Sequence, residues 1–211
     1  MEFFNENLIK EKEDCPHFYS PITAVIRNRR SIYADRYYKK EIPAHELEEI
    51  LTNATWAPTH KMTEPWRFII LSDEQQVDYG NYMFNYHKDR YYDLPEVKRT
   101  VKFEYLKNYP LNAACIVAVV FQKNSQLLPE WEEIAAISCA VQNMALTCTA
   151  LNIGSYWASG GAAVDYVKTL GLTDREQSFG LFFMGYYDLS QKPVTKRRTA
   201  IAEKVIGLKH I

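Results

Sequence analysis

The chain has 211 residues and a formal net charge of −1 at pH 7, with 25 Lys and Arg against 26 Asp and Glu. Hydrophobic residues make up 47% and charged residues 24% of it, the composition of an ordinary soluble globular domain. A net charge near zero gives no electrostatic basis for binding nucleic acid or an anionic membrane. No apolar run approaches the roughly 20 residues that span a bilayer. We therefore expect one soluble domain, with neither nucleic acid nor membrane as a partner.

The first residues and the cysteines indicate a cytoplasmic protein. The segment Met1 to Glu6 is acidic and lacks the basic start and the apolar stretch of a secretion signal. The cysteines show no metal-binding or redox spacing, and all but the first stand in apolar runs, where Cys behaves as a small core residue. They are Cys15, Cys115, Cys139 and Cys148.

Residues 1–20 show no regular period, and we expect them to form an extended N-terminal arm. Pro21 then opens a helix that ends in the segment 27–31, Arg-Asn-Arg-Arg-Ser. Guanidinium groups match phosphate oxygens in pairs, and the hydroxyl of Ser31 adds a donor, so this segment is a candidate phosphate seat. Cations at a helix C-terminus also simply suit the helix dipole. Both interpretations stay open at this point.

Pro43 and Ala44 start a second helix, whose apolar residues recur at spacings of three and four as far as Ala57. Acidic residues in its first turns stabilise the helix, because negative charge near the N-terminus interacts favourably with the helix dipole. The apolar run 68–71 follows and predicts a buried strand. A helix and a strand are thus joined by one short connector.

This connector, residues 58–65, is a central candidate for a functional segment. Pro58 and Pro65 stop the flanking elements and predict fixed, extended turns. Between them, His60, Lys61 and Glu64 place an imidazole, an ammonium and a carboxylate on a stiff segment. Binding groups concentrate on loops held by a rigid scaffold, so we interpret the connector as functional. A solvated loop is the alternative.

The polar and aromatic stretch 73–112 predicts one helix starting at Asp73 and a second from Val97 to Asn108. Such an insertion between two core strands is either a lid or an edge decoration, and we favour the lid. The chain has 15 Tyr, many of them in pairs. Tyrosines suit half-buried surfaces, subunit interfaces and stacking against planar ligands, although compositional bias explains their number equally well.

The second half of the chain alternates strands and helices. The segment from Trp131 to Asn152 predicts a helix that is apolar nearly all round, so we expect several buried sides, one of them covered by a partner subunit. The turn 158–161 allows close approach of a ligand because Gly lacks Cβ. The other predicted elements are strands at 115–121, 153–157 and 179–186, and a helix at 164–170 that closes on Gly171.

A second cationic segment, Lys196 to Arg198, lies far from the first in sequence. If the fold brings it together with the segment 27–31, the two would hold a phosphate better than either alone. The sequence pattern by itself does not say whether they meet.

Over about residues 22–206, the chain resembles the nitroreductase family of FMN-dependent NAD(P)H oxidoreductases, and within it the short, minimal members. The resemblance rests on the order and spacing of several motifs rather than on any one. These are Arg29-Arg30-Ser31, Ala57-Pro58 through Pro65-Trp66-Arg67-Phe68, the helical segment 139–145 and Leu170-Gly171-Leu172 before the strand that ends in Gly185.

The resemblance implies an α+β, nitroreductase-like fold, with a central, mostly antiparallel sheet flanked by helices. It also implies an intertwined homodimer with two FMN sites at the interface. The helix from Trp131 would pack against its twin, and the arm 1–20 and the C-terminal tail would reach over the partner. The whole chain, 1–211, would form a single domain with a helical insertion at about 73–112.

The resemblance also assigns cofactor-binding residues, and it assigns no catalytic or metal-binding side chain. Lys196 and Arg198 would complete a clamp on the FMN phosphate, and His60 and Glu64 would contact FMN from the partner chain. The residues assigned to the phosphate and ribityl chain are Arg29, Arg30 and Ser31, and those assigned to line the flavin, with backbone N–H groups near N5, are Trp157, Ala158 and Ser159.

Two positions depart from the family pattern. Tyr33 stands where many relatives carry a cation near the N1–C2 carbonyl edge of the flavin. Glu64 stands near a position that is Gln or Asn in many relatives. A carboxylate cannot donate a hydrogen bond to the flavin, and its charge disfavours the anionic reduced form unless Lys61 or an Arg offsets it. Flavin tuning is therefore affected more than flavin binding.

The function implied is a ping-pong reaction in which NAD(P)H reduces the flavin by hydride transfer and leaves. A nitroaromatic, a quinone or a related electrophile is then reduced in its place. Other flavin chemistry on the same scaffold stays open as an alternative, such as dehalogenation, flavin destruction or dehydrogenation. So does a flavin-binding dimer without enzymatic activity.

Overall fold

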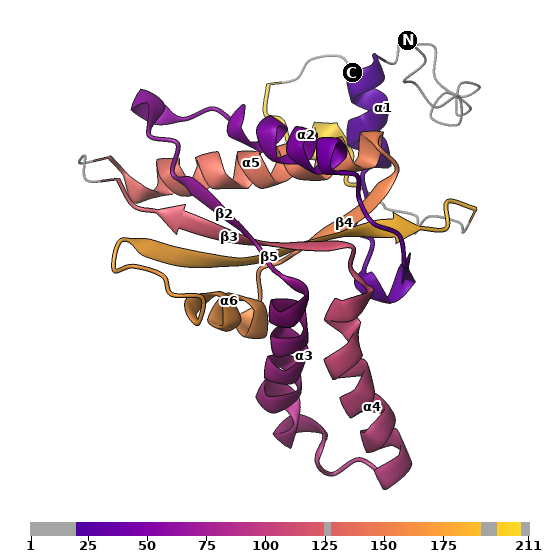
Figure 1. Cartoon of the computed structure of the whole chain (residues 1–211). Coiled ribbons are helices and arrows are strands. Elements are labelled where there is room, and N and C mark those ends of the chain that lie inside the picture. Colours follow the sequence, from indigo (N-terminus) through magenta and orange to yellow (C-terminus); the bar gives the residue numbers. More distant parts are fainter. Residues whose placement is uncertain (1–19, 125–127, 191–197, 208–211) are drawn as a thin grey trace.

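The computed structural model describes residues 20–124, 128–190 and 198–207. A five-stranded sheet lies between two groups of helices, with α1, α2 and α5 on one face and α3, α4 and α6 on the other (Figure 1). The strands are β1 (Tyr37–Tyr38), β2 (Trp66–Ile70), β3 (Cys115–Gln122), β4 (Ile153–Ala158) and β5 (Glu176–Tyr187). The helices are α1 (Pro21–Asn28), α2 (Ala44–Thr55), α3 (Asp73–His87), α4 (Glu96–Asn108), α5 (Glu130–Ala150) and α6 (Gly161–Lys168).

Strand β5 organises the sheet because it pairs with β1, β3 and β4, while β2 is added on β3. All four ladders are antiparallel. The predicted α+β architecture with an antiparallel sheet between helices is therefore confirmed. The predicted N-terminal arm lies outside the described residues, apart from Ser20.

The sheet has a hydrophobic core on each face, which explains why 115–121 is continuously apolar. Successive side chains of a strand point to opposite faces. Val117 and Val119 accordingly pack with Met144 of α5 in one cluster. Ile116 and Ala118 belong to the other cluster. A strand covered on both faces needs no polar positions.

Helix α5 buries one face against the sheet and leaves the opposite face exposed. Ile137 and Met144 are fully buried, whereas Trp131 is 68% exposed. Cys139 is also exposed, so the expectation that it is a core residue is wrong within the single chain. Its position on the helix turns it away from the sheet, unlike the buried Cys115 and Cys148.

Helix α6 differs from its predicted bounds of 164–170. It begins at Gly161 because the carbonyl of Gly160 accepts hydrogen bonds from the N–H groups of Ala163 and Val164, at 3.0 and 3.2 Å. It ends at Lys168, two residues before the predicted end. Gly171 does adopt the left-handed conformation that its predicted closing position needs, with φ of 77°.

Helices α3 and α4 form a hairpin that projects away from the sheet on the side of α6 (Figure 1). Helix α3 starts with a capping box in which Ser72 and Gln75 satisfy each other's backbone N–H groups. The hairpin closes where Phe84 and Phe103 meet edge to face, with ring centroids 4.9 Å apart. Within the described ranges, no helix is long and apolar enough to cross a membrane.

Replacing Gly180 by Ala should destabilise the fold. Gly180 has φ of 89°, and a Cβ there would lie 2.1 Å from the carbonyl oxygen of Ala158. Left-handed strain and this clash together should cost about 2–4 kcal/mol of unfolding free energy, measured by urea denaturation. Gly160→Ala is the matched control because a Cβ there meets nothing within 4 Å. Equal stability of the two variants would contradict this account of the β4–β5 contact.

Candidate functional site

The end of α1 lies beside the start of β4. Ser31 forms a parallel bridge with Ser155, and the N–H of Ile32 donates to the carbonyl of Ser155 at 3.0 Å. Helix α1 ends because Arg29 leaves helical geometry, with ψ of 125°. Arg29, Arg30 and Ser31 therefore form a short segment between the helix end and the sheet, which we call the cradle.

The cradle gathers positive charge. Burial lowers the pKa of the half-buried Arg29 guanidinium, and the charges of Arg30 and Arg198 lower the pKa further. Arg198 is the described residue of the second cationic segment, so the structure brings one cation of that segment to the first, as the phosphate hypothesis requires. Lys196, the other predicted clamp residue, lies outside the described residues. Like charges held together in this way favour an anion between them.

The exposed end of β4 lies further along the same strand. Trp157 is fixed by its indole N–H, which donates to the carbonyl of Phe179 at 2.7 Å. Ala158 pairs with Leu181 of β5, and Ser159 follows, exposed, after the strand. From Ser155 to Ser159 the chain advances about 13 Å at the usual rise of a strand. The cationic cradle thus lies beside the start of β4, and the exposed Ser159 follows the end of the same strand.

Tyr33 occupies the exposed edge next to the cradle. Ser31 and Tyr33 are exposed while Ile32 and Ala34 are buried, as expected for an extended segment on the sheet. The ring of Tyr33 leans on Tyr156, with ring centroids 4.9 Å apart. A neutral phenol therefore stands on the same edge as Ser31.

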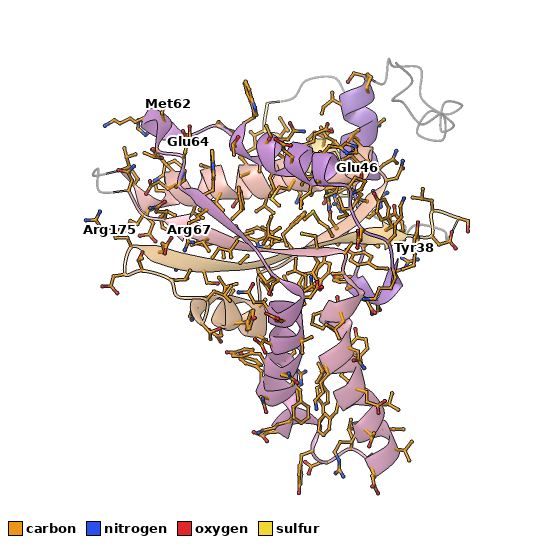
Figure 2. The ribbon with its side chains drawn as sticks, in the orientation of Figure 1. Tyr38, Glu46, Met62, Glu64, Arg67 and Arg175 are labelled. Carbon is orange, nitrogen blue, oxygen red and sulfur yellow. The ribbon has the colours of Figure 1, made fainter. Side chains whose placement is uncertain are left out.

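The connector lies far from the cradle within one chain. His60, in the turn η3 (His60–Met62), pairs through Nδ1 with Glu132 in the first turn of α5. Helix α5 has 21 residues, which makes it about 31 Å long, and the cradle is joined to Ser155, five residues after the other end of this helix. Met62 and Glu64 accordingly lie at the end of the molecule opposite to Tyr38 (Figure 2).

The expectation of extended turns in the connector is wrong at three residues. Lys61, Met62 and Glu64 have φ of 52°, 56° and 44°, in the left-handed region that L-residues seldom adopt. The prolines fix only their own φ and the residue before them, so they do not prevent this geometry. Backbone strain of this kind clusters at ligand-binding and switch regions.

Apolar side chains of the connector and of the segments on the same face of the sheet are exposed. Trp56 is 80%, Met62 79% and Trp131 68% exposed. Ile22 and Ile26 of α1 are also more than half exposed. Sequence patterns did not single out these residues as a surface, because they come from four separate elements. Within the described residues, no cluster of three or more metal-ligating side chains is present.

Comparisons with known proteins place the chain in a family. The model of the family described as "Nitroreductase family" matches residues 26–186. The chain belongs to the nitroreductase family. It is therefore an oxidoreductase of the nitroreductase type. The Bacillus subtilis (strain 168) protein YfhC, provisionally named an NAD(P)H nitroreductase, is 32% identical over 192 residues, which cover 89% of this chain and 94% of that protein.

Solved structures agree with the nitroreductase assignment. The Nitroreductase-like Family Protein from Bacillus cereus has a TM-score of 0.72 and 27% identity, covering 93% of this chain and 100% of that chain. A Desulfovibrio desulfuricans protein, solved in complex with FMN, has a TM-score of 0.68 and 23% identity, covering 92% of this chain and 100% of that chain. At that identity the second match supports the fold alone. The predicted nitroreductase-like fold is confirmed.

An Arg29→Ala/Arg198→Ala double variant should lose bound FMN below detection, because it removes two of the three guanidinium groups that meet at the cradle. Flavin content is measured by absorbance after purification. Arg90→Ala/Arg99→Ala makes the same change of charge on the α3–α4 side of the chain, so it should keep the wild-type flavin content. Unchanged flavin in the cradle variant would show that the cradle does not hold the phosphate.

Proposed function

We propose that this chain is an FMN-dependent NAD(P)H oxidoreductase that reduces nitroaromatics, quinones or related electrophiles. The observation that carries the proposal is the meeting of Arg29, Arg30 and Arg198 beside the start of β4, the strand after whose other end the exposed Ser159 follows. An elongated ligand with an anionic end and a planar end matches such a site. Membership of the nitroreductase family and the similarity to YfhC support the same conclusion.

The residues present fit FMN. The guanidinium groups of the cradle and Arg198 would hold the phosphate, and the exposed hydroxyl of Ser31 would add a donor. Lys196 completes this clamp in the proposal. Trp157, Ala158 and Ser159 would line the flavin, where a hydrogen bond fixes the indole of Trp157 and Ser159 is exposed. The positive charge of the cradle orients the cofactor, because only one end of FMN is anionic.

FMN, when bound, supplies hydride chemistry between NAD(P)H in one half-reaction and an electrophile in the other. The protein binds and orients the reactants. For that reason no side chain acts as nucleophile or general acid. Successive occupation of one open site by donor and acceptor gives ping-pong kinetics.

A second copy of the chain would complete the site. His60 is held at the first turn of α5, whereas the cradle is joined to β4 after the last turn, so His60 and Glu64 would reach an FMN that another subunit holds. The exposed face of α5, together with Ile22, Ile26 and Trp131, offers the apolar surface that a stable homodimer buries. The strained connector then belongs to the partner's cofactor site.

An absorbance spectrum of the purified protein tests the function, taken before and after anaerobic NADPH and then NADH. We expect flavin bands near ~450 nm that bleach with one donor or both and return when a nitroaromatic or quinone is added. The Arg29→Ala/Arg198→Ala variant serves as the flavin-free control.

The other outcomes are equally informative. Flavin bands that persist after both NADPH and NADH would contradict the proposed NAD(P)H-dependent reduction. The protein would then be one that binds flavin without accepting hydride from either donor. Bleaching without reoxidation by either electrophile would indicate other flavin chemistry on this scaffold. Absence of flavin even after reconstitution with FMN would contradict the function altogether.

A further inference from the structure

We propose that Tyr37 is a positioning residue for the cofactor site. Tyr37 holds the cradle in the shape that receives a phosphate. The inference rests on the proposed function, since it specifies how the same site is built. It concerns a residue that neither the sequence patterns nor the family resemblance singled out. Tyr37 does not itself reach the ligand, because it is buried beneath the segment that does, with 8% of its surface exposed.

The ring of Tyr37 lies in a slot made by two glycines. Gly154 of β4 and Gly185 of β5 are directly paired in the sheet. A Cβ on Gly185 would lie 2.5 Å from a ring carbon of Tyr37, and one on Gly154 would lie 2.9 Å from another. Side chains at these positions would expel the ring. The paired glycines therefore let the phenol lie flat across two strands.

From this slot, Tyr37 fixes the end of the cradle. Its hydroxyl donates to the carbonyl of Ile32 at 2.7 Å, while the N–H of Ile32 donates to the carbonyl of Ser155 at 3.0 Å. Both backbone polar groups of Ile32 are thus held. At the other end of the cradle, the N–H of Arg29 donates to the carbonyl of Val25 in α1 at 2.9 Å. The segment between these anchors has little freedom to move.

Such anchoring matters because the cradle is electrostatically unfavourable when empty. Arg29 is flanked by the charges of Arg30 and Arg198, and repulsion between them drives the segment to spread. Holding the backbone before the anion arrives removes an ordering cost from binding. The hydroxyl of Tyr37 therefore contributes to affinity for the phosphate without touching it.

Tyr37→Phe tests the inference, because it keeps the ring in its slot and removes only the hydrogen bond to Ile32. Dissociation constants for FMN and for riboflavin, which lacks the phosphate, are measured by fluorescence titration of the apoprotein. We expect FMN to bind about three- to tenfold more weakly, the size of one lost hydrogen bond. Riboflavin should bind as it does to the wild type.

Tyr38→Phe is the matched control. Tyr38 is the next residue on β1 and stacks on Tyr186, and it is 49% exposed, so its variant should leave both constants unchanged. The thermal midpoint of each apoprotein shows whether the variant is folded at the titration temperature.

Unchanged FMN affinity in Tyr37→Phe would overturn the inference. An equal loss for FMN and riboflavin would also overturn it, because a general loosening of the fold affects both ligands. Failure of the wild-type chain to bind either flavin would instead overturn the proposed function, and this inference with it. The two failures are thus distinguishable from one set of titrations.

Discussion

The pairing of β4 with β5 is the constraint on which the candidate site depends. Gly180 allows the two strands to approach because it admits the carbonyl of Ala158, and the paired Gly154 and Gly185 leave a slot on the strands for the ring of Tyr37. Strand β4 in turn receives the end of α1 through Ser155. The position of the cationic cradle is thus determined by the sheet and not by the loop that carries it.

The length of α5 is the second constraint, because this helix separates the two candidate segments, the connector and the cradle, within one chain. The pair His60–Glu132 holds the connector at the first turn of the helix, and the cradle is joined to β4, which follows the last turn. A site that uses both segments has to be built from two chains related by symmetry. The exposed face of α5 and the neighbouring apolar residues are consistent with this arrangement.

Local sequence patterns predicted the helices and strands well where residues close together in the sequence determine the secondary structure. The continuous apolar run of β3, the proline-initiated helix α1 and the amphipathic pattern of α2 each correspond to an observed element. The start of α6 was missed because Gly161, a weak helix former, opens the helix with no side-chain cap. The left-handed residues of the connector were missed because nothing in Lys61, Met62 or Glu64 favours that conformation.

The site was predictable only in part, since strand register and distant contacts are not encoded in any one segment. Cationic side chains at 27–31 and 196–198 suggested a phosphate seat, but only the fold brings Arg198 to Arg29. The slot for Tyr37 depends on two glycines from different strands being directly opposite each other. No spacing along the chain reveals that register. Cys139 was assigned to the core because residue type does not say which side of α5 faces the sheet.

The claim that one cofactor site combines the cradle of one chain with the connector of another is tested most directly by mixing two defective variants. One carries Arg29→Ala/Arg198→Ala and the other His60→Ala/Glu64→Ala, so either alone forms dimers with impaired sites. Random pairing after joint refolding should restore about a quarter of the wild-type FMN sites, because half of the dimers are mixed and each has one intact site. FMN binding no higher than the average of the two separate variants would contradict a site shared between chains.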